Sequence, residues 1–136
     1  MRAGTVAHFA AATPPTGWLV CTGAAVPRSL YGALFLAIGT TYGAGDGSTT
    51  FNLPDLRGEF LRGLDSGRGV DTGRAIGTAQ ADGIRSHNHA LGLGLGESSL
   101  SPGPPTIQGA GSATTQNTGG AETRPRNVAM LPCIRF

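Results

Sequence analysis

The chain has 136 residues, a formal net charge of +2 and no lysine, so all 10 basic residues are arginine. Without lysine it cannot hold a phosphate-loop lysine, a Schiff-base lysine or a lysine general base, and arginines without basic runs argue against a nucleic-acid partner. Leucine, isoleucine, valine and phenylalanine make up about a fifth of the residues, and glycine with proline about a quarter. Folding of one chain by itself is therefore marginal, and we expect other subunits to complete the core.

Targeting signals and cysteines add further expectations. No segment approaches the ~20 apolar residues of a membrane span, and the N-terminus lacks the charged and apolar regions of a signal peptide. We therefore expect synthesis in the cytoplasm without a signal peptide and no membrane insertion. Cys21 and Cys133 lie far apart in the sequence. Their spacing allows one disulfide but does not predict it, so free buried thiols are the expectation.

The first elements are short strands followed by one helix. Residues 6–9 and 18–21 are strand-like, and the turn residues at 13–17 separate them. From Ser29 apolar residues recur at spacings of three and four, which predicts a helix. Ser29 is its expected cap, and Gly39 can adopt the left-handed conformation at its end.

Two glycine-rich stretches follow the helix. Residues 42–51 could be mistaken for a phosphate cradle, but such a loop needs a preceding strand, a following helix and usually a lysine, so we predict a tight turn. Residues 52–58 continue as extended or turn structure. Residues 63–83 read as a glycine-punctuated loop. Ser66 there lies between aspartate and glycine, but no triad context accompanies it, so a serine hydrolase is rejected.

The most informative stretch begins at His87 and His89 and continues as alternating leucine and glycine to residue 96. In an extended strand, side chains two apart share a face, so the histidines and leucines lie on one face and the glycines on the opposite face. Such a strand suits a crowded axis where several copies meet better than an ordinary sheet. The leucines on this axis are Leu91, Leu93 and Leu95.

The last third of the chain is polar and then recovers strand character. Residues 97–120 are rich in glycine, proline, serine, threonine, asparagine and glutamine, which predicts a long surface loop or disorder. The tail from residue 124 to Phe136 is strand-forming, and we expect it to be tucked into a sheet. The fold class is therefore mainly β with one short helix.

Several blocks together resemble the phage tail collar domain, which is found near the ends of bacteriophage tail fibres. They include PTGWLVCTG at 15–23, YGALF at 31–35, IGTTYG at 38–43 and LPDLRG at 53–58. Further blocks at 73–78, 80–82, 87–89 and 122–129 are similar to the C-terminal receptor-binding tip of Mu-like and related tail fibres. The resemblance covers most of the chain, and only 97–120 matches nothing familiar.

This resemblance implies an intertwined homotrimer at the distal end of a virion's tail fibre. The trimer would be joined to a fibre shaft, and the need for a tail-fibre assembly chaperone stays open. Its tip would bind a bacterial surface carbohydrate, most often lipopolysaccharide. It also implies that His87 and His89 of three chains hold one metal ion per trimer. Six imidazole nitrogens form an octahedral set, which favours iron(II) over tetrahedral zinc, although zinc or another divalent metal stays open. Leu91, Leu93 and Leu95 would stack beside the metal on the trimer axis.

We expect residues 1–136 to form a single tail-fibre tip domain. Its parts are a collar-type region at 1–62, the glycine-punctuated segment with the histidine strand at 63–96, a variable polar loop at 97–120 and a C-terminal strand at 121–136. The polar loop offers hydroxyl and amide groups for sugar binding. Its candidate receptor-binding residues are Ser98, Ser99, Ser101, Thr106, Gln108, Ser112, Thr114, Thr115, Gln116 and Asn117.

Four alternatives were weighed. The histidines could be hydrogen-bonded side chains without a metal. A cupin-like metal enzyme needs a nearby glutamate and a later third histidine, and the remaining histidine, His8, lies upstream. A glycan-cleaving depolymerase needs a carboxylate pair in a cleft, for which Asp65 and Asp71 have no supporting pattern. A purely structural trimerising cap also stays open. We do not expect an enzyme.

Overall fold

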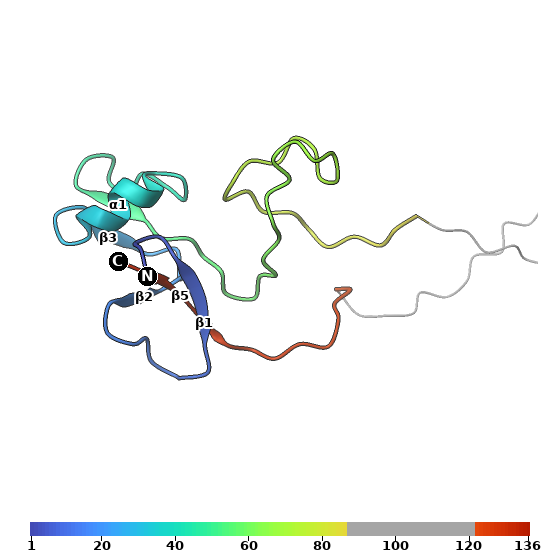
Figure 1. Ribbon diagram of the computed structural model, residues 1–136, viewed down its shortest axis with the longest axis horizontal. Helices are drawn as coiled ribbons and strands as arrows, with labels where there is room; N and C mark the ends of the chain where they lie inside the picture. The colour runs from blue at the N-terminus through green and yellow to red at the C-terminus, as the bar shows by residue number, and fades with distance from the viewer. Residues whose placement is uncertain (87–121) are drawn as a thin grey trace, which may run out of the picture. The chain divides into compact units, whose positions relative to one another are not determined.

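The computed structural model describes residues 1–86 and 122–136, and the fold class is mainly β with one short helix, as predicted (Figure 1). The chain divides into a unit formed by Met1–Gln80 with Arg126–Phe136 and a second unit at Ala81–Pro125. The first unit contains the regular elements: β1 at Val6–Phe9, β2 at Trp18–Val20, β3 at Ala25–Pro27, α1 at Gly32–Ile38, β4 at Thr50–Asn52 and β5 at Leu131–Arg135.

The C-terminal strand β5 lies in the middle of a three-stranded antiparallel sheet in the order β1, β5, β2. Ile134 pairs with Val6 of β1 and with Leu19 of β2. This confirms the predicted strands near residues 6–9 and 18–21 and the tucked C-terminal strand, which starts at Leu131. The two ends of the chain therefore meet in one sheet, and residues far apart in sequence build one core (Figure 1).

The predicted helix forms, but it begins three residues later than Ser29 and has no side-chain cap. Ser29 lies instead in a turn that the Tyr31 backbone N–H closes by donating to the Pro27 carbonyl at 3.2 Å. The predicted end is confirmed. Gly39 has a φ of +56°, a region that favours glycine, and its N–H donates to the Phe35 carbonyl at 2.8 Å.

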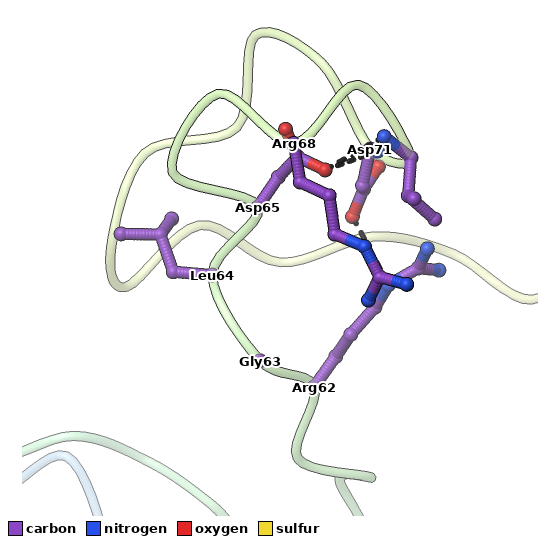
Figure 2. A pocket seen from close by; sticks show the side chains of 7 residues that line it. Arg62, Gly63, Leu64, Asp65, Arg68 and Asp71 are labelled. Carbon is purple, nitrogen blue, oxygen red and sulfur yellow. Dashed lines mark hydrogen bonds and ion pairs between the residues drawn. The ribbon is translucent and has the colours of Figure 1, made fainter.

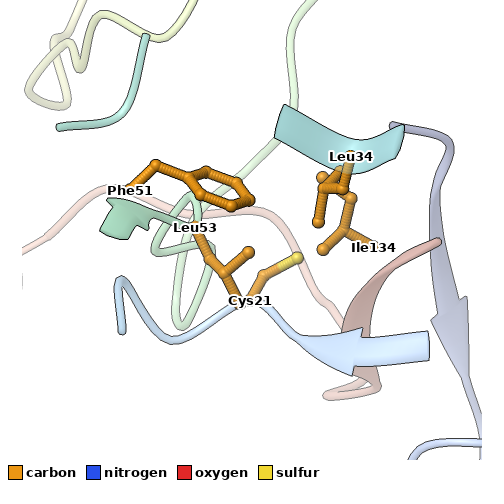
Figure 3. Packing of buried hydrophobic residues seen from close by; sticks show 5 residues of the cluster. All are labelled: Cys21, Leu34, Phe51, Leu53 and Ile134. Atoms are coloured by element: carbon orange, nitrogen blue, oxygen red, sulfur yellow. The ribbon is translucent and has the colours of Figure 1, made fainter. Parts of the chain in front are cut away.

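The core is small, and its buried side chains come from α1, β4, β5 and the residues directly after β2 and β4. Figure 3 shows Leu34 of α1 facing Ile134 of β5, with Phe51, Leu53 and Cys21 completing the cluster. The Phe51 ring also contacts the Phe35 ring, with centroids 5.2 Å apart. All five cluster members are buried.

Both cysteines are free and buried, as expected. Burial, and then the nearby Cys133 and Asp55, raises the pKa of the Cys21 thiol to about 11. Burial also raises the pKa of Cys133. These thiols pack as small apolar side chains and carry no thiolate at neutral pH.

A two-stranded sheet pairs β3 with β4, and the glycine-rich stretch before β4 is the tight turn that the sequence predicted. Asp46 organises this turn, because its carboxylate accepts hydrogen bonds from the backbone N–H groups of Ser48, Thr49 and Thr50. Asn52 accepts one from the Gly45 N–H at 2.8 Å. The N–H groups that a phosphate would need are thus occupied by the chain's own side chains.

Two aromatic side chains, those of Trp18 and Tyr31, pack against other rings. Trp18 packs edge-on against Phe9, and Tyr31 packs edge-on against Phe136, each pair with ring centroids 4.9 Å apart. Such pairs stabilise beyond the area they bury.

Candidate functional site

The predicted metal, axis and receptor-loop residues all fall in 87–121, outside the described residues. This applies to His87 and His89, to Leu91, Leu93 and Leu95, and to the polar residues between 98 and 117. Their roles therefore stay predictions. Within 1–86 and 122–136, no group of three or more histidine, cysteine, aspartate or glutamate side chains could hold a metal ion. His8, the histidine that the structure does describe, is exposed on β1.

The second unit shows how the chain leaves and returns around this stretch. The Thr123 backbone N–H donates to the Asp82 carboxylate at 3.2 Å, although the two residues are 41 positions apart. The chain therefore departs after Asp82 and re-enters before Thr123 at neighbouring points.

Residues 62–74 form the predicted loop, and a carboxylate organises it. The Asp65 Oδ1 atom accepts hydrogen bonds from the backbone N–H groups of Val70 at 2.8 Å and Asp71 at 2.9 Å, and Oδ2 accepts one from Gly69 at 3.0 Å. Figure 2 shows the loop curling around this side chain. The backbone N–H of Gly69, followed by that of Asp71, lowers the pKa of Asp65. A carboxylate held ionised by backbone donors supports the loop and is poorly suited to act as a general acid.

The second carboxylate of the loop is shared between two arginines. Arg62 Nε lies 3.2 Å from Asp71 Oδ2, and Arg74 Nε lies 4.0 Å from the same oxygen. The Asp71 side chain is only 16% exposed, so this ion pair is partly shielded from water. Asp65 and Asp71 are thus both engaged in holding the loop, and they do not form the free carboxylate pair that glycan cleavage would require.

A hollow of about 260 Å³ opens beside these residues. Arg62 and Arg68 come from different parts of the loop and both line it (Figure 2). Leu64 and Val70 line it as well. This grouping was not predicted from the sequence, in which the arginines form no basic run. A signal was present, because Arg62, Arg68 and Arg74 repeat every six residues around two aspartates with the same separation.

Near its end the loop contacts the turn that follows α1, within the same unit. A side-chain carbon at Gly77 would lie 3.1 Å from the Tyr42 ring and 3.2 Å from the Thr41 methyl group, and its φ is +81°. Both the space and the backbone conformation therefore require glycine. This close approach, inside the 73–78 block, ties the loop to the turn that follows α1.

Apolar side chains are exposed in the described residues that follow β4. Phe60 is 59% exposed, Ile84 is 69% exposed and Val128 is 87% exposed. None of the described residues forms a helix long and apolar enough to cross a membrane. Each of these side chains is exposed to water in a single copy of the chain. We call these exposed side chains the exposed apolar run, and it comprises Phe60, Leu61, Ile76, Ile84, Val128 and Met130.

Comparison with known proteins agrees with the resemblance seen in the sequence. Residues 4–61 match the family model of the Phage Tail Collar Domain. The chain is 46% identical over 88 residues to the uncharacterized protein StfE of Escherichia coli (strain K12), a match that covers 65% of this chain and 44% of that protein. It is 30% identical over 140 residues to protein RhiB of Rhizobium leguminosarum bv. viciae, which covers 88% of this chain and 64% of that protein. The chain thus spans less than two thirds of either relative's length, and its residues 4–61 are similar to the phage tail collar domain.

Proposed function

We propose that this chain is the trimeric, receptor-binding tip of a phage-type tail fibre and that it attaches the particle to a glycan on the bacterial surface. The match to the tail collar domain supports a place in a phage-type tail. We propose the trimer, the metal ion and the glycan receptor in addition to this match. The observation that carries the proposal is the exposed apolar run that continues beyond the collar region.

The exposed run supports an assembly of identical chains. The five-residue core cluster is small for a chain of this length, whereas Phe60, Ile84 and Val128 stay in water in a single copy. Burying apolar area contributes about 25 cal/mol per Å², so covering these side chains with two further copies supplies stability that one chain lacks. Symmetric copies are the commonest way for a soluble protein to achieve this.

A metal at His87 and His89 fits the same arrangement. Two imidazoles supply only part of the coordination sphere of a first-row metal, so the remaining ligands must come from elsewhere. Three copies supply six nitrogens, which suits iron(II). When bound, the ion crosslinks the three chains and has no catalytic part in this proposal.

Receptor contact is assigned to residues 97–120. The hydrogen bond between Thr123 and Asp82 supports this assignment, because it holds the two sides of the excursion together near the point of departure. A segment anchored in this way on a stable scaffold is a common carrier of recognition. Weak single-site affinity would be raised by the three copies in each fibre and by several fibres on a particle.

The proposal is tested by replacing residues 97–120 with the corresponding segment of a related fibre that attaches to another host strain. We expect binding to whole cells to follow the transplanted segment, while the native mass stays that of a trimer. If cell binding is unchanged, the receptor contact lies elsewhere. If assembly is lost, the segment is part of a structural cap.

A further inference from the structure

We infer that the hollow beside Arg62 and Arg68 is a second glycan contact, one that takes the anionic group of an acidic sugar. This inference rests on the proposed function, because it names the class of ligand at a site separate from residues 97–120. The ligand chemistry is a carboxylate or phosphate oxyanion carried on a sugar ring. Both sources present the paired oxygens that an arginine fork binds in two places.

The charge balance of the loop leaves one arginine available. Asp71 is engaged by Arg62 and Arg74. Asp65 is occupied by backbone N–H groups and faces the inside of the turn. The Arg68 side chain lines the hollow and, among the described residues, makes no hydrogen bond or ion pair. Two arginines and two aspartates line the hollow, and because Arg62 and both aspartates are engaged within the loop, the Arg68 charge is the one left for a ligand.

The loop also fixes the backbone that carries Arg68 before any ligand arrives. The Arg68 backbone N–H donates to the Asp65 carbonyl at 3.0 Å, which closes the turn that carries the side chain. The neighbouring N–H groups of Gly69 and Val70 are bonded to the Asp65 carboxylate. Since the backbone on both sides of Arg68 is tied down, less ordering entropy is lost when a ligand binds.

The size and lining of the hollow fit one sugar unit. Its volume of about 260 Å³ lies just below the usual range for small-molecule sites, which begins at roughly 300 Å³. Leu64 is 48% exposed and Val70 is 64% exposed, so both can contact the C–H groups of a sugar ring. The site therefore combines a charged end with an apolar wall, as an acidic monosaccharide does.

The test compares the full chain with the variants Arg68→Gln, Arg68→Lys and, as a control, Arg2→Gln. Arg2 is exposed and lies outside the loop and the lining of the hollow. The probes are galacturonic acid, galactose 1-phosphate, galactose and inorganic phosphate, with binding followed by ligand-observed NMR at low salt. We expect millimolar binding of at least one acidic sugar and none of galactose. Arg68→Gln should weaken this binding at least tenfold, Arg68→Lys should weaken it partially, and Arg2→Gln should leave it unchanged.

The two acidic probes distinguish a carboxylate from a phosphate as the ligand group. Equal binding of the acidic sugar to wild type and Arg68→Gln, or equal binding of galactose and galacturonic acid, would overturn the inference. Binding of inorganic phosphate alone would reduce the hollow to a simple anion site and would also overturn it. A whole-cell assay separates this inference from the proposed function. If the protein binds cells but binds no acidic sugar, only the inference about the hollow is refuted. If it binds an acidic sugar but binds no cells, the proposed receptor function is refuted.

Discussion

Replacing Phe60 by alanine probes the proposed assembly directly, and the same replacement at Phe51 provides the matched control. Phe51 is completely buried in one chain, whereas Phe60 is 59% exposed. A phenylalanine buries about 150–250 Å² when fully covered, so covering the exposed part of Phe60 removes about 90–150 Å² from water. At about 25 cal/mol per Å², this contributes roughly 2–4 kcal/mol per chain in the assembly and nothing in a lone chain.

Phe51→Ala should instead cost about 3–5 kcal/mol in any state, because it leaves a cavity in the core. Thermal unfolding across a range of protein concentrations, with native mass measured at each one, separates the two effects. We expect Phe51→Ala to lower the melting temperature at every concentration. Phe60→Ala should melt like wild type where the chains are dissociated and should shift assembly to higher concentration. If Phe60→Ala assembles and melts like wild type at all concentrations, the argument that other copies cover this run is refuted.

Three further predictions concern the metal, acid stability and the thiols. Changing both His87 and His89 to alanine should abolish bound metal and lower the trimer's melting temperature, and an unchanged melt with no metal in the wild type would remove the metal from the account. The side-chain hydrogen bond from Arg57 lowers the pKa of Asp55 to about 2. The resulting stabilisation is present above the unfolded value of about 3.9 and is lost as pH falls toward 2, so denaturant titrations should show less acid loss in Asp55→Asn than in wild type. Cys21 and Cys133 should resist iodoacetamide at pH 8 in the native protein and react after unfolding, and rapid native labelling would contradict their burial.

The parts of the fold that sequence could predict are those with a clear local signal. Strand patterns at 6–9 and 18–21 and the glycine after the helix correspond to β1, β2 and Gly39. Strand β3 was not predicted, because three residues that include Pro27 carry no usable periodicity. The helix start was wrong because the turn between Pro27 and Tyr31 is set by a backbone hydrogen bond, and the side chain of Ser29 takes no part in it.

The candidate hollow illustrates a different limit of prediction. The sequence gives Asp65 and Asp71 no pattern that supports a catalytic pair, but their spacing alone does not predict which groups each carboxylate contacts. Asp65 turns inward onto backbone N–H groups of its own loop, whereas Asp71 turns to Arg62. The loop's conformation decides which aspartate faces backbone and which faces arginine. Gly67 and Gly69 contribute to that conformation with positive φ values. Sequence separation does not encode that choice.

The most direct test of the central claim is the native mass of the purified chain together with its metal content. We predict a species of three times 13.7 kDa that carries one metal ion. A stable 13.7 kDa monomer that melts cooperatively and independently of concentration would contradict the claim that the exposed apolar run is completed by two further copies.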